Sequence, residues 1–136
     1  MSQPQWMRID IDALEHPPLH LVPEDRCCFL REYTPGGGFS ASVGNDDILN
    51  FKMHPNLRGT SQWPYKERAA RKFAEELAVL FRDLTLTAFV LPTSRTIDDP
   101  EFDPRFDMML GHLATRCHQS RGRQSDQEAE EHASAA

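Results

Sequence analysis

The strongest constraint on the fold is an amphipathic segment that leads directly into an apolar one. Four large apolar residues recur at the spacing of one helix face: Phe73, Leu77, Leu80 and Leu84. This spacing predicts a helix, and Pro64 suits its first turn. The run of residues 86–91 (LTAFVL) then predicts a strand that is buried on both faces. A helix that precedes a doubly buried strand is typical of an α/β fold.

The long helix also has a charged face, which we expect to be solvated. Its members are Lys66, Arg68, Arg71, Lys72, Glu75 and Glu76. Alanines beside the apolar stripe are small, so we expect the helix to pack closely on a sheet.

A hairpin is predicted before this helix. Residues 27–33 form its first strand and residues 39–43 its return strand. Between them, residues 34–38 (TPGGG) predict a turn, because proline presets the first corner and glycine adopts positive φ. A phosphate-cradling glycine loop is the weaker interpretation, since such loops open directly into a helix.

Two shorter helices complete the predicted elements. The first is capped by Asn45 or Asp46 and ends near His54. The second begins with Asp103 as N-cap and Pro104 at the first helical position, which are typical residues for these positions.

Composition divides the chain into three parts. Residues 1–26 predict an extended arm, because two adjacent prolines at 17 and 18 stop regular structure. Residues 27–118 form the α/β core. Residues 119–136 contain no large apolar side chain, so a disordered polar tail is predicted.

Charge and cysteine content narrow the function. The 136 residues have a formal net charge of −6, which disfavours broad nucleic-acid binding because phosphate backbones need a basic surface. No apolar run is long enough to span a membrane, and the N-terminus lacks the pattern of a secretion signal. Three cysteines, two of them adjacent, are a poor disulfide framework. We therefore expect a cytoplasmic protein with reduced thiols.

The order of motifs resembles the first half of ComF-type phosphoribosyltransferases. A strand ends in Glu32-Tyr33, and a short helix ends in Asn50-Phe51-Lys52. A long helix then contains residues 73–77 (FAEEL), and a strand closes on residues 91–95 (LPTSR). The segment 98–106 (DDPEFDPRF) is similar to the one that follows this strand in phosphoribosyltransferase-like relatives.

The resemblance implies a partial phosphoribosyltransferase-like, Rossmann-like three-layer core with an incomplete sheet. Such enzymes displace pyrophosphate from phosphoribosyl pyrophosphate, with Mg²⁺ spreading the developing charge. In this chain Thr93, Ser94 and Arg95 would bind phosphate, since they supply hydroxyls and a guanidinium. Lys52 matches a lysine of the family and is a substrate-contact candidate. A surface ion pair with Glu32 is the other interpretation of Lys52.

The second half of such an enzyme site is missing from the sequence. Asp98-Asp99 is the only acidic doublet near the required place, and Pro100-Glu101 follows where a phosphate loop needs glycine and small donors. We assign no catalytic residue and no metal ligand. His16 and His20 have metal-like spacing, but the prolines between them prevent the helix that would align them. Mg²⁺ is expected only with bound phosphoribosyl pyrophosphate.

Two function classes remain open. The first is a truncated, catalytically incomplete phosphoribosyltransferase-like protein that binds a phosphorylated small molecule. The second is a non-enzymatic interaction module that pairs through an exposed sheet edge. Either class predicts a homo-dimer or a partner chain that completes the sheet.

Overall fold

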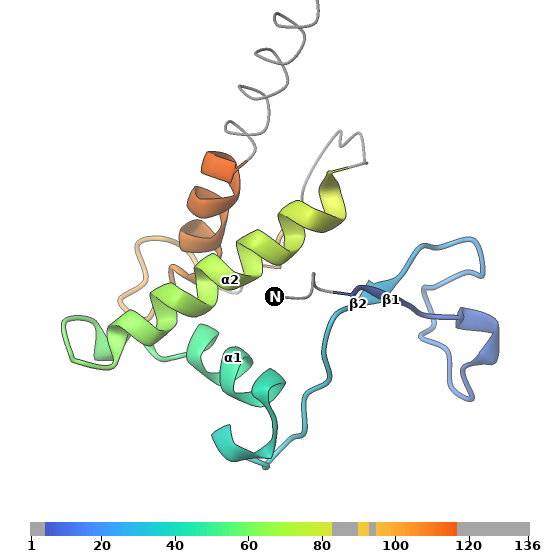
Figure 1. Ribbon diagram of the computed structural model, residues 1–136, viewed down its shortest axis with the longest axis horizontal. Coiled ribbons are helices and arrows are strands. Elements are labelled where there is room, and N and C mark those ends of the chain that lie inside the picture. Colours follow the sequence, from blue (N-terminus) through green and yellow to red (C-terminus); the bar gives the residue numbers. More distant parts are fainter. Residues whose placement is uncertain (1–4, 83–89, 93–94, 117–136) are drawn as a thin grey trace, which may run out of the picture. The chain divides into compact units, whose positions relative to one another are not determined.

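The computed structural model describes residues 5–82, 90–92 and 95–116 (Figure 1). The chain divides into two compact units, Met1–Asp46 and Asp47–Ala136. Within the described residues, the fold combines helices with a small two-stranded antiparallel sheet. No helix among these residues has the length and apolar content that a membrane crossing requires.

The sheet of the first unit joins the N-terminal segment to the predicted first strand. β1 (Met7–Arg8) pairs antiparallel with β2 (Cys28–Phe29), with Met7 opposite Phe29. The predicted strand 27–33 is therefore much shorter than expected. Its partner comes from the predicted arm rather than from residues 39–43.

The hairpin prediction is wrong, and Asn45 supplies the physical reason. Its fully buried carboxamide accepts a hydrogen bond from Thr34 N (2.8 Å) and donates to Thr34 O (2.9 Å) and Gly38 O (3.1 Å). These bonds connect both ends of the predicted turn to a side chain of the following helix, and the turn is closed by Asn45 instead of by paired strands. A short 3₁₀ helix, η2 (Phe39–Ala41), replaces the return strand. The glycine turn itself exists, because Gly36 and Gly38 have φ of 75° and 66°.

The short helix forms as predicted, with a different cap. α1 spans Val43–Phe51, and the hydroxyl of Ser42 accepts the Asn45 backbone N–H at 3.0 Å. Ser42 is thus the cap, because the side chain of Asn45 is committed to the preceding loop. A second 3₁₀ turn, η3 (Pro55–Leu57), follows α1.

The long helix and the last helix also form. α2 spans Trp63–Phe81 with Pro64 in its first turn, as predicted. The C-terminal helix is described over residues 105–116. Asp103 accepts the Arg105 backbone N–H at 3.0 Å, which confirms Asp103 as its cap.

The core of the second unit lies between these helices. Its buried members are Phe51, Ala69, Ala70, Ala74, Met109 and Leu113. The ring of Phe51 contacts Phe73 and Phe106 edge-on, with centroids 4.8 Å and 5.7 Å away. The alanines of α2 therefore pack against helical residues in the described structure, where packing on a sheet was predicted.

The predicted central strand and tail lie almost entirely outside the described residues. Of residues 86–91 only Val90 and Leu91 are described, and Val90 is 89% exposed where burial was predicted. The tail, 119–136, also lies outside the description. Since β1 and β2 are the only strands among the described residues, a three-layer core stays a prediction.

Candidate functional site

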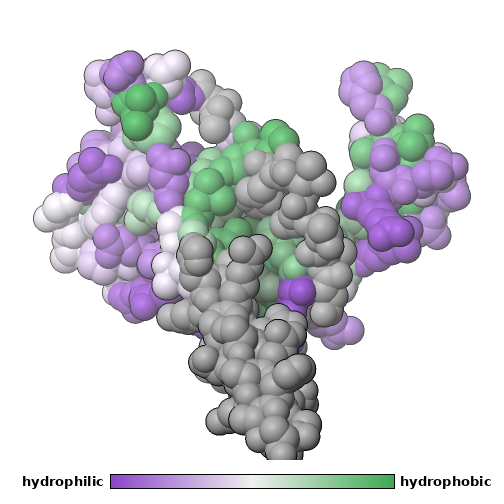
Figure 2. Space-filling view, turned by 90° about the horizontal axis from the view of Figure 1, so that it is seen from above, coloured by the Kyte–Doolittle hydropathy of each residue, from purple (hydrophilic) through white to green (hydrophobic). Residues whose placement is uncertain are grey.

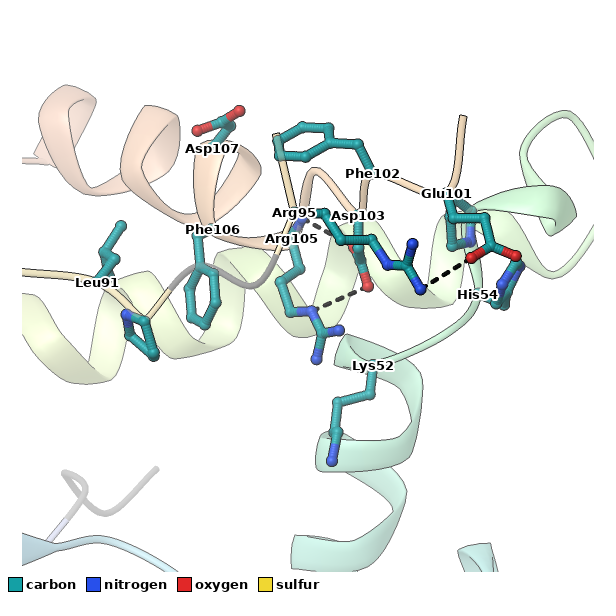
Figure 3. Close-up of a pocket in the computed structure, with 12 residues that line it drawn as sticks. Lys52, His54, Leu91, Arg95, Glu101, Phe102, Asp103, Arg105, Phe106 and Asp107 are labelled. Atoms are coloured by element: carbon teal, nitrogen blue, oxygen red, sulfur yellow. Dashed lines mark hydrogen bonds and ion pairs between the residues drawn. The ribbon is translucent and has the colours of Figure 1, made fainter. Parts of the chain in front are cut away.

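A pocket of about 250 Å³ opens in the second unit beside the end of α1 and the start of the C-terminal helix (Figure 3). One part of its lining is apolar: Pro55, Leu91, Pro92, Phe102 and Phe106. The polar part consists of Lys52, His54, Arg95, Glu101, Asp103, Arg105 and Asp107. Seven of the twelve lining residues are therefore polar or charged, and Figure 3 shows the Lys52 side chain directed away from Arg95.

Lys52 and Arg95, which the sequence analysis selected from separate motifs, both line this pocket. Lys52 lies one residue beyond the end of α1, where its backbone N–H still donates to Ile48 O at 2.9 Å. Its ammonium is exposed and has no ion-pair partner among the described residues of its own unit. The proposed pair with Glu32 stays a prediction, because Glu32 belongs to the other unit.

Arg95 lines the pocket but is bound to two carboxylates. Its guanidinium contacts Asp99 Oδ2 at 3.1 Å and Glu101 Oε2 at 2.9 Å. Asp99 in turn accepts the Glu101 backbone N–H at 2.8 Å. This bond, together with Arg95, holds the pKa of Asp99 below its usual value. The other predicted phosphate ligands, Thr93 and Ser94, lie outside the described residues.

Lys66 is the residue that sequence reasoning misplaced. We expected it on a solvated face, but its side chain is fully buried. Its ammonium donates to Phe51 O (2.7 Å), Met53 O (2.8 Å) and Asp103 Oδ1 (2.8 Å). Burial lowers the pKa of Lys66, although the bond to Asp103 acts in the opposite direction.

The expectation of a solvated face also fails at Glu76, which is nearly buried. A sequence signal for the buried face did exist. Lys66 precedes Ala69 and Ala70 by three and four residues, so all three share one side of α2. Alanines at this spacing mark the face of closest helix contact.

Asp103 connects Lys66 to the pocket. One carboxylate oxygen, Oδ1, accepts from the Lys66 ammonium and from the Arg105 backbone N–H. The other, Oδ2, accepts from Arg105 Nε at 2.9 Å. The Arg105 guanidinium is therefore tied to a carboxylate that is itself held by a buried lysine.

The lining of the pocket combines three cations with three acids, Glu101, Asp103 and Asp107. Lys52, Arg95 and Arg105 place three cations around one pocket. His54 uses Nδ1 to accept the Asn56 backbone N–H at 3.2 Å, so it caps η3. No group of three His, Cys, Asp or Glu side chains in the described parts of the chain is arranged to hold a metal ion. The described acids therefore offer no ready-made site for Mg²⁺.

Comparison of the chain with protein-family models, with curated proteins and with solved structures finds no match.

Proposed function

We propose that the pocket binds the phosphate or pyrophosphate group of a small molecule, in a phosphoribosyltransferase-like chain that is catalytically incomplete. One observation carries this proposal: Lys52 and Arg95, selected from distant motifs, line a single pocket together with Arg105. Phosphate oxygens accept hydrogen bonds from guanidinium and ammonium groups, and arginine can bind them in a bidentate manner.

The carboxylates around Arg95 do not prevent phosphate binding. Both Arg95 and Glu101 are about half exposed, with 47% and 56% of their side-chain surfaces accessible. Exposed ion pairs contribute only about 0–1 kcal/mol, so a phosphate can replace Glu101 at little cost. Lys52 needs no such exchange.

The reaction implied by the resemblance depends mostly on positioning and charge stabilisation. The described pocket supplies cations for a leaving pyrophosphate, while the acidic and glycine-containing motif for the ribose phosphate is missing from the sequence. In this proposal the chain binds pyrophosphate but does not transfer a phosphoribosyl group. Its three-layer core would be built around the strand predicted at residues 86–91, and Mg²⁺ would enter with the ligand.

The direct test is calorimetric titration of the full chain with pyrophosphate at two salt concentrations. Arg95→Ala removes a charge-assisted contact and should weaken binding by about 10- to 150-fold, because such contacts contribute roughly 1.5–3 kcal/mol. The matched control is Arg68→Ala, since Arg68 is exposed on α2, stacks on Tyr65 and does not line the pocket. Wild-type affinity in the Arg95→Ala protein would reject the site assignment.

A second candidate function is pairing with another chain. It is favoured by exposed apolar side chains in the second unit, Val90 at 89% and Ile97 at 75%. Apolar side chains lie among hydrophilic ones on the face seen in Figure 2. Large exposed apolar patches mark interaction sites. A homo-dimer in light scattering, weakened by Val90→Asp, is the expected result; a monomer at all concentrations would contradict this candidate.

A further inference from the structure

We infer that Asp103 is a positioning residue of the anion pocket, which aims the Arg105 guanidinium at the ligand and is itself fixed by Lys66. This inference rests on the proposed function, since it assigns a role within the same site. It begins with Lys66. An ammonium has three N–H donors, and here all three directions have acceptors: two backbone carbonyls and one carboxylate.

The two carbonyls belong to the residues next to Lys52, which lines the pocket. Phe51 O and Met53 O lie on either side of Lys52 in the sequence, just where α1 ends. A cation there also interacts favourably with the negative end of the helix dipole. Lys66 therefore fixes the backbone that carries Lys52 while it holds Asp103.

The carboxylate of Asp103, held in place by Lys66, in turn fixes the side chain of Arg105. Its two oxygens accept from Lys66, from the Arg105 backbone and from Arg105 Nε. Figure 3 shows the Arg105 side chain extending from its helix toward the end of α1 that carries Lys52. With Nε bound to Asp103, the planar guanidinium has a set orientation, and its remaining N–H groups are available to a ligand.

The sign of the expected effect separates positioning from simple electrostatics. Asp103 is an acid in the lining of an anion pocket, so charge alone predicts that Asp103→Asn tightens pyrophosphate binding. Positioning predicts the opposite. Asparagine keeps an oxygen for Lys66 and for the helix cap, but its amide nitrogen cannot accept from Arg105 Nε. The guanidinium then loses its orientation, and ordering it again on binding weakens the affinity.

The experiment is a double-mutant cycle read out by pyrophosphate titration of the full chain. We expect Asp103→Asn and Arg105→Gln each to weaken binding about tenfold, and the double variant to bind no more weakly than Arg105→Gln alone. A merely structural role for Asp103 would weaken binding whichever residue stands at 105. Additive effects, or unweakened binding by Asp103→Asn, would overturn the inference.

Two further variants complete the design. Glu101→Gln removes an acid from the same pocket without touching Arg105, and it should tighten binding by removing one of the two carboxylates that pair with Arg95. Arg105→Lys keeps the charge and leaves the Lys66–Asp103 pair intact, but lysine has no Nε fork; it should bind more weakly than wild type and more tightly than Arg105→Gln. Wild-type affinity in Arg105→Lys would reject the positioning role of Asp103 but not the proposed function. Absence of pyrophosphate binding by the wild-type chain would reject the proposed function, and the inference with it.

Discussion

At the scale of single residues, Lys66 determines how the second unit is held together. Burying an ammonium costs several kcal/mol unless a counter-charge and hydrogen bonds replace water. Asp103 and two carbonyls provide these here. The residue therefore contributes to stability only while every acceptor remains in place.

Replacing Lys66 should reveal this dependence. Lys66→Met removes the donor to the Phe51 and Met53 carbonyls and one of the three donors to the Asp103 carboxylate, so the free energy of unfolding should fall by about 3–5 kcal/mol in urea titrations. The matched control is Lys72→Met on the same helix. Lys72 is 43% exposed and pairs with Asp47, so its loss should cost less than about 1 kcal/mol. Equal costs for the two variants would contradict the account of Lys66.

The pH dependence of stability gives a second measurement on the same residue. Burial lowers the pKa of Lys66 from 10.5, so below that pH the unfolded chain binds the proton more tightly than the folded chain. The contribution of Lys66 to the free energy of unfolding should therefore rise as pH increases through its folded pKa toward 10.5. Urea titrations across this range should show the rise in wild type and not in Lys66→Met. The same rise in both proteins would assign it to another group.

At the scale of elements, local signals predicted the helices and failed at the hairpin. The helical spacing of apolar residues and the proline at the helix start are signals that involve only residues close in sequence. α2 begins next to Pro64 and continues to Phe81, as these signals predict. The hairpin depended on how two strands pair. That outcome was decided by Asn45, whose carboxamide binds Thr34 and Gly38. A residue suited to capping a helix can equally close a loop, and its sequence position does not distinguish these roles.

The same limit applies to the faces of α2. The spacing of the alanines indicates which face of α2 makes contacts. A lysine on that face cannot be distinguished from an exposed lysine in the sequence, because the groups that accept its hydrogen bonds are not identified there. The acceptors of Lys66 come from α1 and from Asp103, which are distant in sequence. The pocket cations Lys52 and Arg95 were predicted from their motifs, whereas Arg105 and Lys66 became visible only through these tertiary contacts.

Close helix packing makes a further prediction at this scale. Ala70 is fully buried in the cluster with Met109 and Leu113. Ala70→Leu should therefore lower the free energy of unfolding by about 1–3 kcal/mol, because added methylenes force neighbouring side chains apart. Arg71→Leu, one residue further along α2 and exposed, should change it by about 0.5 kcal/mol or less. A harmless Ala70→Leu would show that α2 has room on this face.

At the scale of the whole molecule, the described residues divide into two compact units, and only the second contains the pocket. The sequence predicted a mixed α/β chain, and helices with a small antiparallel sheet are present. The parallel three-layer core stays a prediction, because its central strand lies almost wholly outside the described residues. The proposed function therefore depends on the pocket and not on the fold class.

The most direct test of that pocket is an NMR titration of the full, isotope-labelled chain with pyrophosphate. We expect saturable shifts of the side-chain N–H signals of Arg95 and Arg105 and of the Lys52 ammonium, with Arg68 unmoved. The shifts of Arg105 should become smaller in Asp103→Asn. Uniform small shifts of all exposed cations, without saturation, would mean that pyrophosphate meets only a screened charged surface, and would contradict the anion pocket.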